Sequence, residues 1–434
     1  MHEKLREKIL SKKAKIAIIG LGYVGLPLAM TFIGKGFKVY GIDVDKDRVD
    51  RLKNSKSYIL DVPSQDIKKA ISEGSLMVTT DFRNIKKSDA VIICVPTPLY
   101  KTKEPDVSYI VSAVKNIKKH MRRGQIVVLE STTYPGTTEE VILPVLESGG
   151  LKEGMDFYLA FSPERIDPGN ARYNTKNTPK VIGGISKNST EIAMLLYRQV
   201  IDTVVPVSSA KVAEMVKLLE NTFRIVNIGL VNELMLMCDK MDINIWEVID
   251  AAKTKPYGFM PFYPGPGVGG HCIPVDPIYL SWKARMQGFE ARFIDLASQV
   301  NSEMPHYVVN KVTEALNYRR KPVRCSKILI MGVAYKKDVK DLRESPALEI
   351  IDILLEKGAL VSYYDSHLPY LKIGKINLKG LKFGKNAFRD SDCVVIVTDH
   401  SGIDYKFVAE NSDLVVDTRN ILKGIKSKRN IVRI

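Results

Sequence analysis

The stretch from Lys15 to Asp43 constrains the fold more than any other part of the chain. A short apolar run leads into Gly20-Leu-Gly22-Tyr-Val-Gly25, which is followed by an apolar helical segment and a second apolar run that ends at Asp43. A G-x-G-x-x-G sequence between a strand and a helix, with an acidic residue after the next strand, is typical of a βαβ dinucleotide-binding unit. The sequence therefore predicts a parallel α/β sheet that begins here.

The three glycines of this loop each have a physical role. Gly20 permits the tight turn, Gly22 lets a pyrophosphate approach the main chain, and Gly25 lets the helix pack on the strand. The helix N-terminus would face the phosphates. Asp43 would bind the adenosine ribose and repel a 2′-phosphate, which favours NAD over NADP; the alternative is a glycine-rich turn that binds nothing. The cofactor-binding residues predicted in this unit are Gly20, Gly22, Tyr23, Val24, Gly25 and Asp43.

Three further apolar runs predict strands, at 90–95, 125–129 and 157–161. Ligands of open parallel sheets bind beyond the carboxyl ends of the strands. Taken singly, a polar residue at such an end is as well explained as a turn or cap residue, but three after a fingerprint loop favour function. The residues concerned are Thr97, Thr132 and Glu164.

An irregular loop runs from Phe262 to Pro277 and holds four glycines and four prolines in sixteen residues. Such a segment cannot be a helix or a central strand, and its glycines let a ligand approach the main chain closely. Cys272 lies in its middle, so its thiol is a candidate nucleophile. The alternative is a turn between helices that happens to contain a cysteine.

The segment from Ser208 to about Met241 predicts one long helix, because it holds more than thirty residues without proline. Ser208 or Ser209 can cap it. Lys217 and Asn221 are four residues apart and therefore share a face, either as functional groups or as an ordinary solvated pair. A helix this long and apolar also indicates a domain connector and a dimer interface. Met235 and Met237 are expected in the core.

A second α/β unit begins at Lys327. It has the same alternation of predicted strands and helices as the first unit but lacks G-x-G-x-x-G. Its basic loop residues Lys336, Lys337 and Arg343 lie where phosphates would be met, or else form a solvated basic loop. The predicted fold class is α/β, with two Rossmann-like domains joined by a long central helix and a helical middle domain. The predicted domains are 1–206 for NAD binding, 207–320 with the Cys272 loop and a dimer interface, and 321–434 for the second α/β unit.

Composition excludes some classes of function. The N-terminus is charged and no apolar run has the length of a membrane span, so we expect a cytoplasmic protein with no membrane association. The net charge of +16 comes from lysines spread along the chain without a nucleic-acid motif, so we expect no nucleic-acid partner. The five cysteines show no metal-ligand spacing, so no metal site is predicted.

Several motifs occur in a specific order along nearly the whole chain. They are Gly20–Gly25, Cys94-Val-Pro-Thr-Pro98, Glu130-Ser-Thr-Thr133, Ser162-Pro-Glu-Arg165, Lys217-x-x-x-Asn221, Gly269-Gly-His-Cys-Ile-Pro-Val-Asp276 and Asp341-Leu-Arg-Glu-Ser-Pro346. With two Rossmann-like domains around a long helix, this set resembles the UDP-glucose/GDP-mannose dehydrogenase superfamily. The resemblance implies oxidation of the C6 hydroxymethyl of a nucleotide sugar to a carboxylate with two NAD⁺, for polysaccharide biosynthesis.

The resemblance also implies a chemical role for each matching residue. Lys217 and Asn221 would hold the C6 oxygen as it gains negative charge. Cys272 would attack the aldehyde and carry a thiohemiacetal and then a thioester. Glu164 would act as general base, with Thr132 placing a water. Asp276 would order Cys272, Lys217 or the water, whereas His271 is expected to be a packing residue of the loop. The predicted catalytic set is Cys272, Lys217, Asn221, Glu164, Asp276 and Thr132.

Further ligand contacts are carried over in the same way. The family's NAD contacts match Arg48, Thr97, Thr132 and Arg343, in addition to the glycine loop and Asp43. The UDP-sugar contacts match Glu164, Arg165, Lys217, Asn221, Phe262, Tyr263, Gly265, Gly267 and Lys336. The resemblance also implies that the domain at 321–434 binds the UDP-sugar. The length and apolar character of the helix at 208–241 predict a homodimer through that helix.

One departure bears on the sugar. Members that oxidise UDP-glucose usually carry a second acidic residue four positions after Pro163-Glu164, where this chain has Pro168. That form is most similar to enzymes for UDP-N-acetylhexosamines, so UDP-N-acetylglucosamine is the first choice, UDP-N-acetylmannosamine the second, and UDP-glucose follows. The rivals are a two-electron dehydrogenase, which needs neither Cys272 nor a second α/β domain, and a nucleotide-sugar-binding protein without redox activity. NAD reduction by a UDP-sugar would exclude the latter.

Overall fold

The computed structural model divides the chain into two compact units. The first is Met1–Glu220 with Ile278–Phe289, and the second is Asn221–Pro277 with Glu290–Ile434. The structure describes residues 2–59, 61–165, 167, 172–270, 272–374, 376–425 and 430–434. The expectations for Pro168 and His271 therefore lie outside the described residues. The division into three domains stays a prediction.

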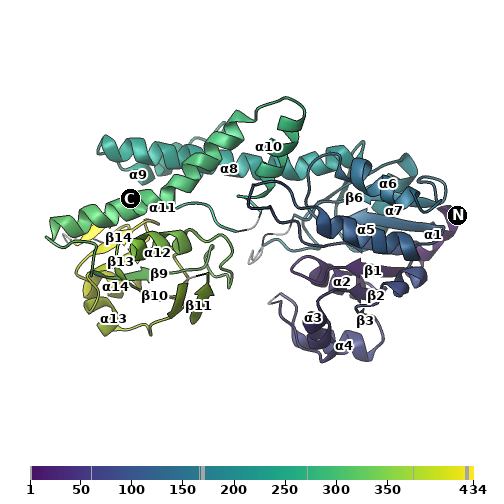
Figure 1. Ribbon diagram of the computed structural model, residues 1–434, viewed down its shortest axis with the longest axis horizontal. Coiled ribbons are helices and arrows are strands. Elements are labelled where there is room, and N and C mark those ends of the chain that lie inside the picture. The colour runs from purple at the N-terminus through teal and green to yellow at the C-terminus, as the bar shows by residue number, and fades with distance from the viewer. Residues whose placement is uncertain are drawn as a thin grey trace. The chain divides into compact units, whose positions relative to one another are not determined.

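The first unit is built on an eight-stranded sheet with the order β3-β2-β1-β4-β5-β6-β7-β8 (Figure 1). All neighbouring strands are parallel except β6 and β7, which are antiparallel. Its elements are α1 (His2–Leu10), β1 (Lys15–Ile19), α2 (Gly25–Ile33), β2 (Lys38–Ile42), α3 (Lys46–Lys53), α4 (Ser64–Ser72), β3 (Leu76–Thr79), η1 (Phe82–Lys87), β4 (Ala90–Ile93), α5 (Ser108–His120), β5 (Gln125–Leu129), η2 (Thr138–Ile142), α6 (Leu143–Glu147), β6 (Phe157–Phe161), β7 (Lys180–Gly184), α7 (Lys187–Tyr197), β8 (Val204–Pro206) and most of α10 (Asp276–Met286).

Apolar residues on both faces of the sheet explain why helices cover both. In β1, Ile16 and Ile18 pack with α1, α2 and α7, whereas Ala17 and Ile19 pack with α5 and α6 on the other face. This alternation is the expected period of a strand that is buried on both sides. The register pairs Ile19 with both Ile42 and Ile93, so β1, β2 and β4 end at one level. The residues that follow these strands therefore lie beyond the same edge.

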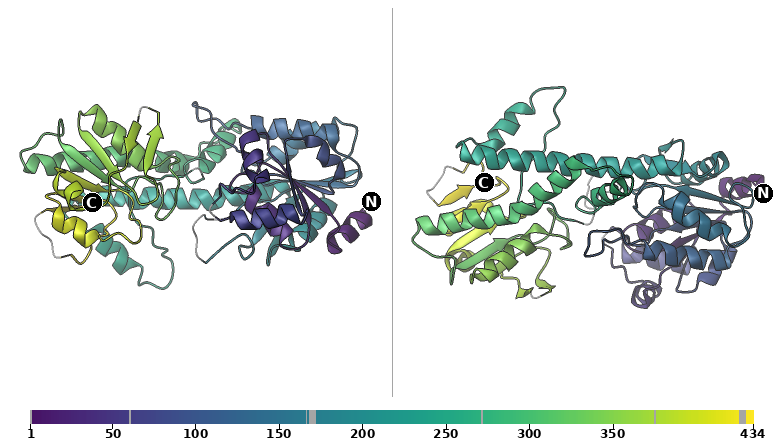
Figure 2. Two further views of the ribbon diagram at one scale, coloured as in Figure 1. Left: turned by 90° about the horizontal axis from the view of Figure 1, so that it is seen from below. Right: turned by 45° about the horizontal axis from the view of Figure 1, so that its top comes forward.

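Helix α8 (Ala210–Lys240) is one continuous helix of 31 residues (Figure 2). The Ser209 hydroxyl accepts a hydrogen bond from the Val212 N–H at 3.2 Å, which confirms the predicted cap. Met235 is buried, but the expectation that Met237 is a core residue is wrong, because its exposed fraction is 47%. Two residues that are two positions apart in a helix point to different sides, so only one of them can face the core.

The second unit carries a parallel five-stranded sheet with the order β10-β9-β13-β14-β15 and a separate hairpin, β11-β12. Helices α11 and α12 pack on one face of the larger sheet, and α13 and α14 pack on the other. The elements are α9 (Ile245–Ala252), α11 (Arg292–Tyr318), β9 (Lys327–Met331), α12 (Pro346–Glu356), β10 (Leu360–Tyr364), β11 (Tyr370–Ile373), β12 (Ile376–Lys379), α13 (Lys385–Arg389), β13 (Cys393–Ile396), α14 (Tyr405–Asn411), β14 (Val415–Asp417) and β15 (Ile431–Arg433). The predicted fold class, with two Rossmann-like α/β sheets and a helical middle region, is confirmed.

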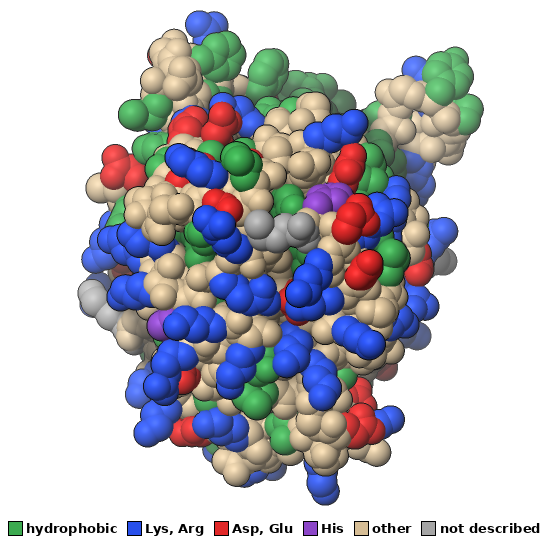
Figure 3. All heavy atoms as spheres, turned by 90° about the vertical axis from the view of Figure 1, so that its right-hand side faces the viewer, with side chains coloured by type: hydrophobic (Ala, Val, Ile, Leu, Met, Phe, Trp, Pro, Cys, Tyr) green, Lys and Arg blue, Asp and Glu red, His purple; other side chains and the backbone are tan. Residues whose placement is uncertain are grey.

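The surface agrees with a dispersed positive charge. On the face seen in Figure 3, Lys and Arg side chains are spread widely, with Asp and Glu side chains among them. Across the residues that the structure describes, no helix is both long and apolar enough to cross a membrane.

Candidate active site

The glycine loop of the first unit has the geometry that a dinucleotide requires. Gly20 has φ +91°, and a Cβ there would lie 2.4 Å from the Cys94 carbonyl oxygen. A Cβ at Gly25 would lie 1.9 Å from the Gly20 carbonyl oxygen, so this position is tightly packed. A Cβ at Gly22 would meet nothing within 4 Å. The open space therefore lies above Gly22, where a pyrophosphate would approach.

Asp43 ties this loop to the end of β2. It is buried, and its Oδ2 accepts a hydrogen bond from the Leu21 N–H at 2.8 Å while Oδ1 accepts from the Asp45 N–H at 2.9 Å. The Arg48 guanidinium lies 3.8 Å from Asp43 and 3.2 Å from Asp45. Arg48 is thus placed beside the carboxylate that would bind the ribose. Of the other loop residues, Val24 is the N-cap of α2 and Tyr23 is exposed.

The carboxyl ends of β4 and β5 are joined by hydrogen bonds. The Ser131 hydroxyl donates to the Val95 carbonyl oxygen at 2.8 Å. The Tyr279 hydroxyl of α10 donates to the Thr97 carbonyl oxygen at 2.7 Å. Thr97 and Thr132 are both half-buried. These contacts hold Thr97 and Thr132 at the edge of the sheet where the sequence places them.

Glu164 and Arg165 follow β6 and have separate partners. The Arg165 N–H donates to Glu164 Oε1 at 2.7 Å, and Lys180 Nζ lies 3.2 Å from Glu164 Oε2. The Arg165 guanidinium pairs with Glu220 of α8 at 2.5 Å. Arg165 is therefore engaged in an ion pair that joins this loop to α8.

Glu214 on α8 holds the turn that follows β5. Its carboxylate accepts hydrogen bonds from the Gly136 N–H at 2.5 Å, the Thr138 N–H at 2.9 Å and the Thr138 hydroxyl at 2.6 Å. Burial raises the pKa of Glu214 to about 7, although these donors oppose the shift. Thr132 belongs to the same segment after β5. The hydrogen bonds of Glu214 therefore hold the segment that contains Thr132 against α8.

Lys217 and Asn221 lie one helical turn apart on α8 and are both buried, with exposed fractions of 8% and 4%. Among the described residues, Lys217 has neither an ion pair nor a side-chain hydrogen bond. Asn221 Nδ2 donates to Asp276 Oδ2 at 2.5 Å. A buried ammonium without a counter-ion is costly unless a ligand compensates it, so the burial of Lys217 is compatible with its predicted role, which stays a prediction.

The Cys272 loop packs against the second α/β unit. The Gly270 N–H donates to the Arg343 carbonyl oxygen at 3.0 Å, and a Cβ at Gly269 would lie 2.7 Å from the Tyr335 side chain. The Asp276 N–H donates to the Cys272 carbonyl oxygen at 2.8 Å, which starts α10. Cys272 is half-buried. The loop thus holds this thiol at a defined place rather than in a solvated turn.

The earlier part of the loop meets a buried amide pair and an arginine. The Gly265 N–H donates to Asn232 Oδ1 at 3.0 Å, and Asn232 Nδ2 donates to Asn301 Oδ1 at 2.8 Å. A Cβ at Gly265 would lie 2.6 Å from an Arg419 guanidinium nitrogen. A side chain at position 265 would therefore have to displace the Arg419 guanidinium.

The two aromatic residues of this loop are placed by other rings. Phe262 is half-buried and meets Phe223 edge to face, with ring centroids 5.7 Å apart. Tyr263 stacks on Trp246 at 5.9 Å and is 43% exposed. A Cβ at Gly267, where φ is +128°, would lie 3.2 Å from Pro346.

In the second unit an aspartate follows β10, as Asp43 follows β2 in the first unit. Asp365, at the end of β10, accepts hydrogen bonds from the N–H groups of Val333 and Ala334 at 2.8 and 3.1 Å. Its Oδ2 also lies 3.0 Å from His400 Nε2. Asp365 matches Asp43 in place, and both carboxylates accept hydrogen bonds from the loop after the first strand of their sheet and from the residues that follow them.

The basic residues of that unit lie in the loop after β9. Arg343 is 42% exposed at its side chain and pairs with Asp341, with Nη2 to Oδ2 at 2.5 Å. Lys336 is half-buried. Both are accessible to an anionic ligand, and their roles stay predictions.

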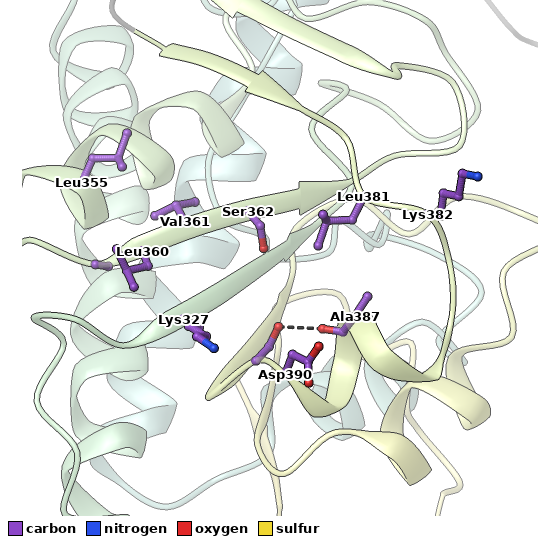
Figure 4. Close-up of a pocket in the computed structure, with 11 residues that line it drawn as sticks. Lys327, Leu355, Leu360, Val361, Ser362, Leu381, Lys382, Ala387 and Asp390 are labelled. Atoms are coloured by element: carbon purple, nitrogen blue, oxygen red, sulfur yellow. Dashed lines mark hydrogen bonds between the residues drawn. The ribbon is translucent and has the colours of Figure 1, made fainter.

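Two other features were considered as ligand sites. Asp338, His367 and His400 place possible metal-ligand atoms within 4.8 Å, but His400 Nδ1 already accepts from the Asp338 N–H at 3.0 Å and Nε2 is bound to Asp365. A hollow of about 640 Å³ lies at the amino ends of β9 and β10, beside Lys327 and Leu360 (Figure 4). Ligands of such sheets bind at the opposite end. We assign a ligand to neither.

Some residues that build the site were not singled out from the sequence. Glu130, Lys180, Asn232 and Arg419 are polar residues that contact site residues only through the fold. Glu130 belongs to the motif Glu130-Ser-Thr-Thr133, which by itself indicates no role for this residue. A charged residue inside an apolar run, such as Lys180 at the start of Lys180–Gly184, is the signal that could have identified one of them.

Comparison with known proteins identifies the family that has this architecture. Family models match the chain as the NAD binding domain at residues 14–201, the central domain at 211–303 and the UDP binding domain at 329–424. A dinucleotide-binding sheet, a helical segment and a second nucleotide-binding sheet define an NAD-dependent dehydrogenase of nucleotide-linked substrates. The chain belongs to the UDP-glucose/GDP-mannose dehydrogenase family.

Individual relatives cover most of the chain. UDP-N-acetyl-D-mannosamine dehydrogenase of Methanococcus maripaludis is 37% identical over 94% of this chain and 93% of its own. UDP-N-acetyl-D-glucosamine 6-dehydrogenase of Pseudomonas aeruginosa is 40% identical over 82% of this chain and 83% of its own. The solved structure of UDP-D-ManNAc dehydrogenase from Pyrococcus horikoshii has a TM-score of 0.88 at 34% identity, covering 97% of this chain and 99% of that one. The family, the class of enzyme and the NAD cofactor are confirmed.

Proposed function

We propose that the protein oxidises the C6 hydroxymethyl of a UDP-N-acetylhexosamine to the carboxylate, with UDP-N-acetylglucosamine as the first choice. Relatives named for this sugar and for UDP-N-acetyl-D-mannosamine both support an amino sugar. UDP-N-acetylmannosamine is the second candidate, supported by the relative from Methanococcus maripaludis, and UDP-glucose is the third. The observation that carries the proposal is Lys217, a buried ammonium with no partner in the described part of the chain.

The fingerprint loop and Asp43 would hold the cofactor. The open space at Gly22, the tight packing of Gly25 and the carboxylate of Asp43 all fit a dinucleotide. When bound, NAD⁺ accepts a hydride in each of the two oxidation steps. Arg48, Thr97, Thr132 and Arg343 are further proposed contacts.

Lys217 and Asn221 provide the electrostatic part of the mechanism. As the C6 hydroxyl loses its proton, negative charge develops on its oxygen. An ammonium and an amide N–H aimed at that oxygen stabilise this charge. Asp276 accepts a hydrogen bond from one N–H of Asn221 and so orients the amide.

Cys272 provides the covalent part. Its thiolate adds to the aldehyde carbon, forming a C–S bond and a thiohemiacetal. The second oxidation leaves a thioester on Cys272. Water then attacks the thioester carbon while Glu164 takes the proton from the water, the C–S bond breaks and the thiolate leaves. Thr132 is proposed to help place this water. The aldehyde is never released, because it stays attached to the protein between the steps.

The nucleotide would be bound by the second unit. Phe262, Tyr263, Gly265 and Gly267 of the loop and Lys336 are the proposed contacts, as is Arg165 in the first unit. Arg419 joins them as a positive group beside Gly265. A UDP diphosphate is complementary to these cations.

A homodimer is proposed through α8. Large apolar side chains are exposed at helical spacing along this helix and directly after it: Val212, Met215, Leu219, Phe223, Leu230, Met237 and, just beyond its end, Met241. A continuous apolar stripe of this kind marks a protein interface, and identical stripes are self-complementary about a two-fold axis. The double variant Leu230→Glu/Met237→Glu should shift the mass measured by light scattering to that of a monomer, whereas Lys240→Glu should not.

The cytoplasmic location also stays a prediction.

The main test is the NADH formed per molecule of UDP-sugar consumed. We expect two NADH per sugar with wild type, and Cys272→Ala should fail to complete the oxidation, with Cys238→Ala as a control at a buried thiol of α8. One NADH per sugar would refute the covalent route. A parallel series with UDP-N-acetylglucosamine, UDP-N-acetylmannosamine and UDP-glucose, compared by kcat/KM, identifies the sugar.

A further inference from the structure

A buried charged cluster lies behind Glu164 in the first unit. Lys180 Nζ lies 3.0 Å from Glu130 Oε2 and 3.2 Å from Glu164 Oε2, and it also contacts the Pro163 carbonyl oxygen at 3.4 Å. The Tyr197 hydroxyl donates to Glu130 Oε1. Exposed fractions are 1% for Glu130, 4% for Lys180 and 0% for Tyr197. We call Glu130, Lys180 and Tyr197 the supporting cluster.

The supporting cluster comes from three elements that are distant in sequence. Glu130 follows β5, Lys180 is the first residue of β7, and Tyr197 is the last residue of α7. Since β6 lies between β5 and β7 in the sheet, the residues that follow β6 face the cluster. Glu164 is one of those residues. The sheet topology thus brings a lysine to the carboxylate proposed as the general base.

The supporting cluster and Glu164 together hold two carboxylates but only one ammonium group. One ammonium serves two carboxylates, and burial disfavours an uncompensated charge. Burial raises the pKa of Glu130 to about 7. Burial alone would lower the pKa of Lys180, but Glu130 and Glu164 together raise it above its usual value. The two carboxylates therefore favour the charged form of Lys180.

Only Glu164 of the two carboxylates can serve a ligand. Its side chain is 13% exposed and that of Glu130 is fully buried. Glu164 and Lys180, together with Thr175 and Thr178, line a cavity of about 10 Å³. That volume is close to the minimum that holds one water. The carboxylate, its cation and a place for a water thus occur together.

We propose that Lys180 is the positioning residue of Glu164, which it holds ionised and in one orientation, and that Glu130 and Tyr197 fix Lys180 for this task. This inference rests on the proposed role of Glu164 in the hydrolysis step. A neighbouring ammonium favours the charged form of a carboxylate, which is the form that accepts a proton from water. The Arg165 N–H fixes the other oxygen, Oε1.

Other ionisable groups near Glu164 do not replace Lys180. The Arg165 guanidinium is engaged with Glu220 of α8. Cys94, at the end of β4, has a pKa raised well above its usual value by burial, with Glu130 adding to the effect. The thiol therefore stays neutral. Among the described residues around Glu164, Lys180 is the cation that contacts its carboxylate.

The test compares Lys180→Met, which removes the charge at similar volume, with Lys180→Arg, which keeps it. For Lys180→Met we expect kcat to fall roughly tenfold to a hundredfold, less than the full contribution of a general base. The KM for the UDP-sugar should change little. The acid limb of the pH–rate profile should move to higher pH, and Lys180→Arg should restore both kcat and the profile. A merely structural role would not move the profile.

A double variant serves as the control for effects of Lys180→Met on stability. Lys180→Met leaves Glu130 and Glu164 without their counter-ion, so the double variant Lys180→Met/Glu130→Gln removes one of the two charges and should recover the unfolding midpoint. It should not recover kcat, because Glu164 still lacks its cation. Recovery of full activity and a normal pH profile in the double variant would overturn the inference.

A readout without turnover separates this inference from the proposed function. The infrared carboxylate band that Glu164→Gln removes should persist at pH 5 in wild type and Lys180→Arg and be lost in Lys180→Met. If wild type forms no NADH with any of the three sugars, the proposed function fails. If instead the band and the pH profile are unchanged in Lys180→Met, the positioning role fails while the proposed function stands.

Discussion

The side-chain amide of Asn221 donates a hydrogen bond of 2.5 Å to the Asp276 carboxylate, and both groups are buried. Asn221 belongs to α8, one turn after Lys217, and Asp276 begins α10 four residues after Cys272. The bond restricts the amide to one orientation. It therefore links the residue proposed to stabilise the oxyanion to the segment that carries the nucleophile.

Asn221→Ala should lower kcat by about 100- to 1000-fold, because one donor to the developing oxyanion is lost. Asp276→Asn keeps the shape but removes the charged acceptor that orients Asn221, so its kcat should fall less. Steady-state kinetics with the UDP-sugar measure both. A larger loss in Asp276→Asn than in Asn221→Ala would show that Asp276 has a role of its own.

Lys217→Met should lower kcat by about 100-fold or more, since a cation is removed from the place where charge develops. The exposed Lys211 on the same helix is the matched control, and Lys211→Met should retain activity. Because Lys217 has no partner among the described residues, its removal should not lower the unfolding midpoint. A large drop in that midpoint would indicate a structural lysine instead.

Gly22→Ala should weaken NAD binding, whereas Gly25→Ala should lower the stability of the fold. The added methyl at Gly22 meets no protein atom within 4 Å, so the variant should fold normally and bind NAD about 10- to 100-fold more weakly, because the methyl occupies the space of the pyrophosphate. The methyl at Gly25 would lie 1.9 Å from the Gly20 carbonyl oxygen, so this variant should lose stability. Calorimetry of NAD binding and thermal unfolding separate the two effects. Normal NAD affinity in Gly22→Ala would argue against this loop as the pyrophosphate site.

Glu214 should make stability depend on pH. Burial raises its pKa from 4.5 to about 7, so its contribution to stability is fully present below pH 4.5 and is lost as the pH rises through 7. The shift corresponds to roughly 3 kcal/mol. Glu214→Gln removes the titration, so the free energy of unfolding should fall less between pH 4.5 and 7 than in wild type. Urea unfolding at several pH values measures this, and identical slopes in both proteins would contradict it.

The fingerprint, the strand ends and the long helix could be predicted because each is a local pattern. The period of apolar residues reports the strands, and Gly20, Gly22 and Gly25 report a turn whose requirements extend over only six residues. The sequence does not predict the antiparallel β7, because this strand begins with a lysine and ends in two glycines, which leaves an apolar run of only Val181 and Ile182. Met237 was misplaced because an apolar side chain on a long helix belongs as readily to an interface as to a core.

The sequence by itself determined that the chain forms two Rossmann-like sheets, that the first binds NAD, and that Cys272 lies in a loop made for close approach. Only the tertiary structure decided that Asn221 meets Asp276 and that Lys180 joins Glu130 to Glu164. These partners are 55, 50 and 16 residues apart. No local period relates side chains at such separations, since their contact depends on strand order and on how α8 and the loops pack. Local sequence patterns therefore identify most residues of the site, whereas the balance of their charges depends on contacts that form only in the folded chain.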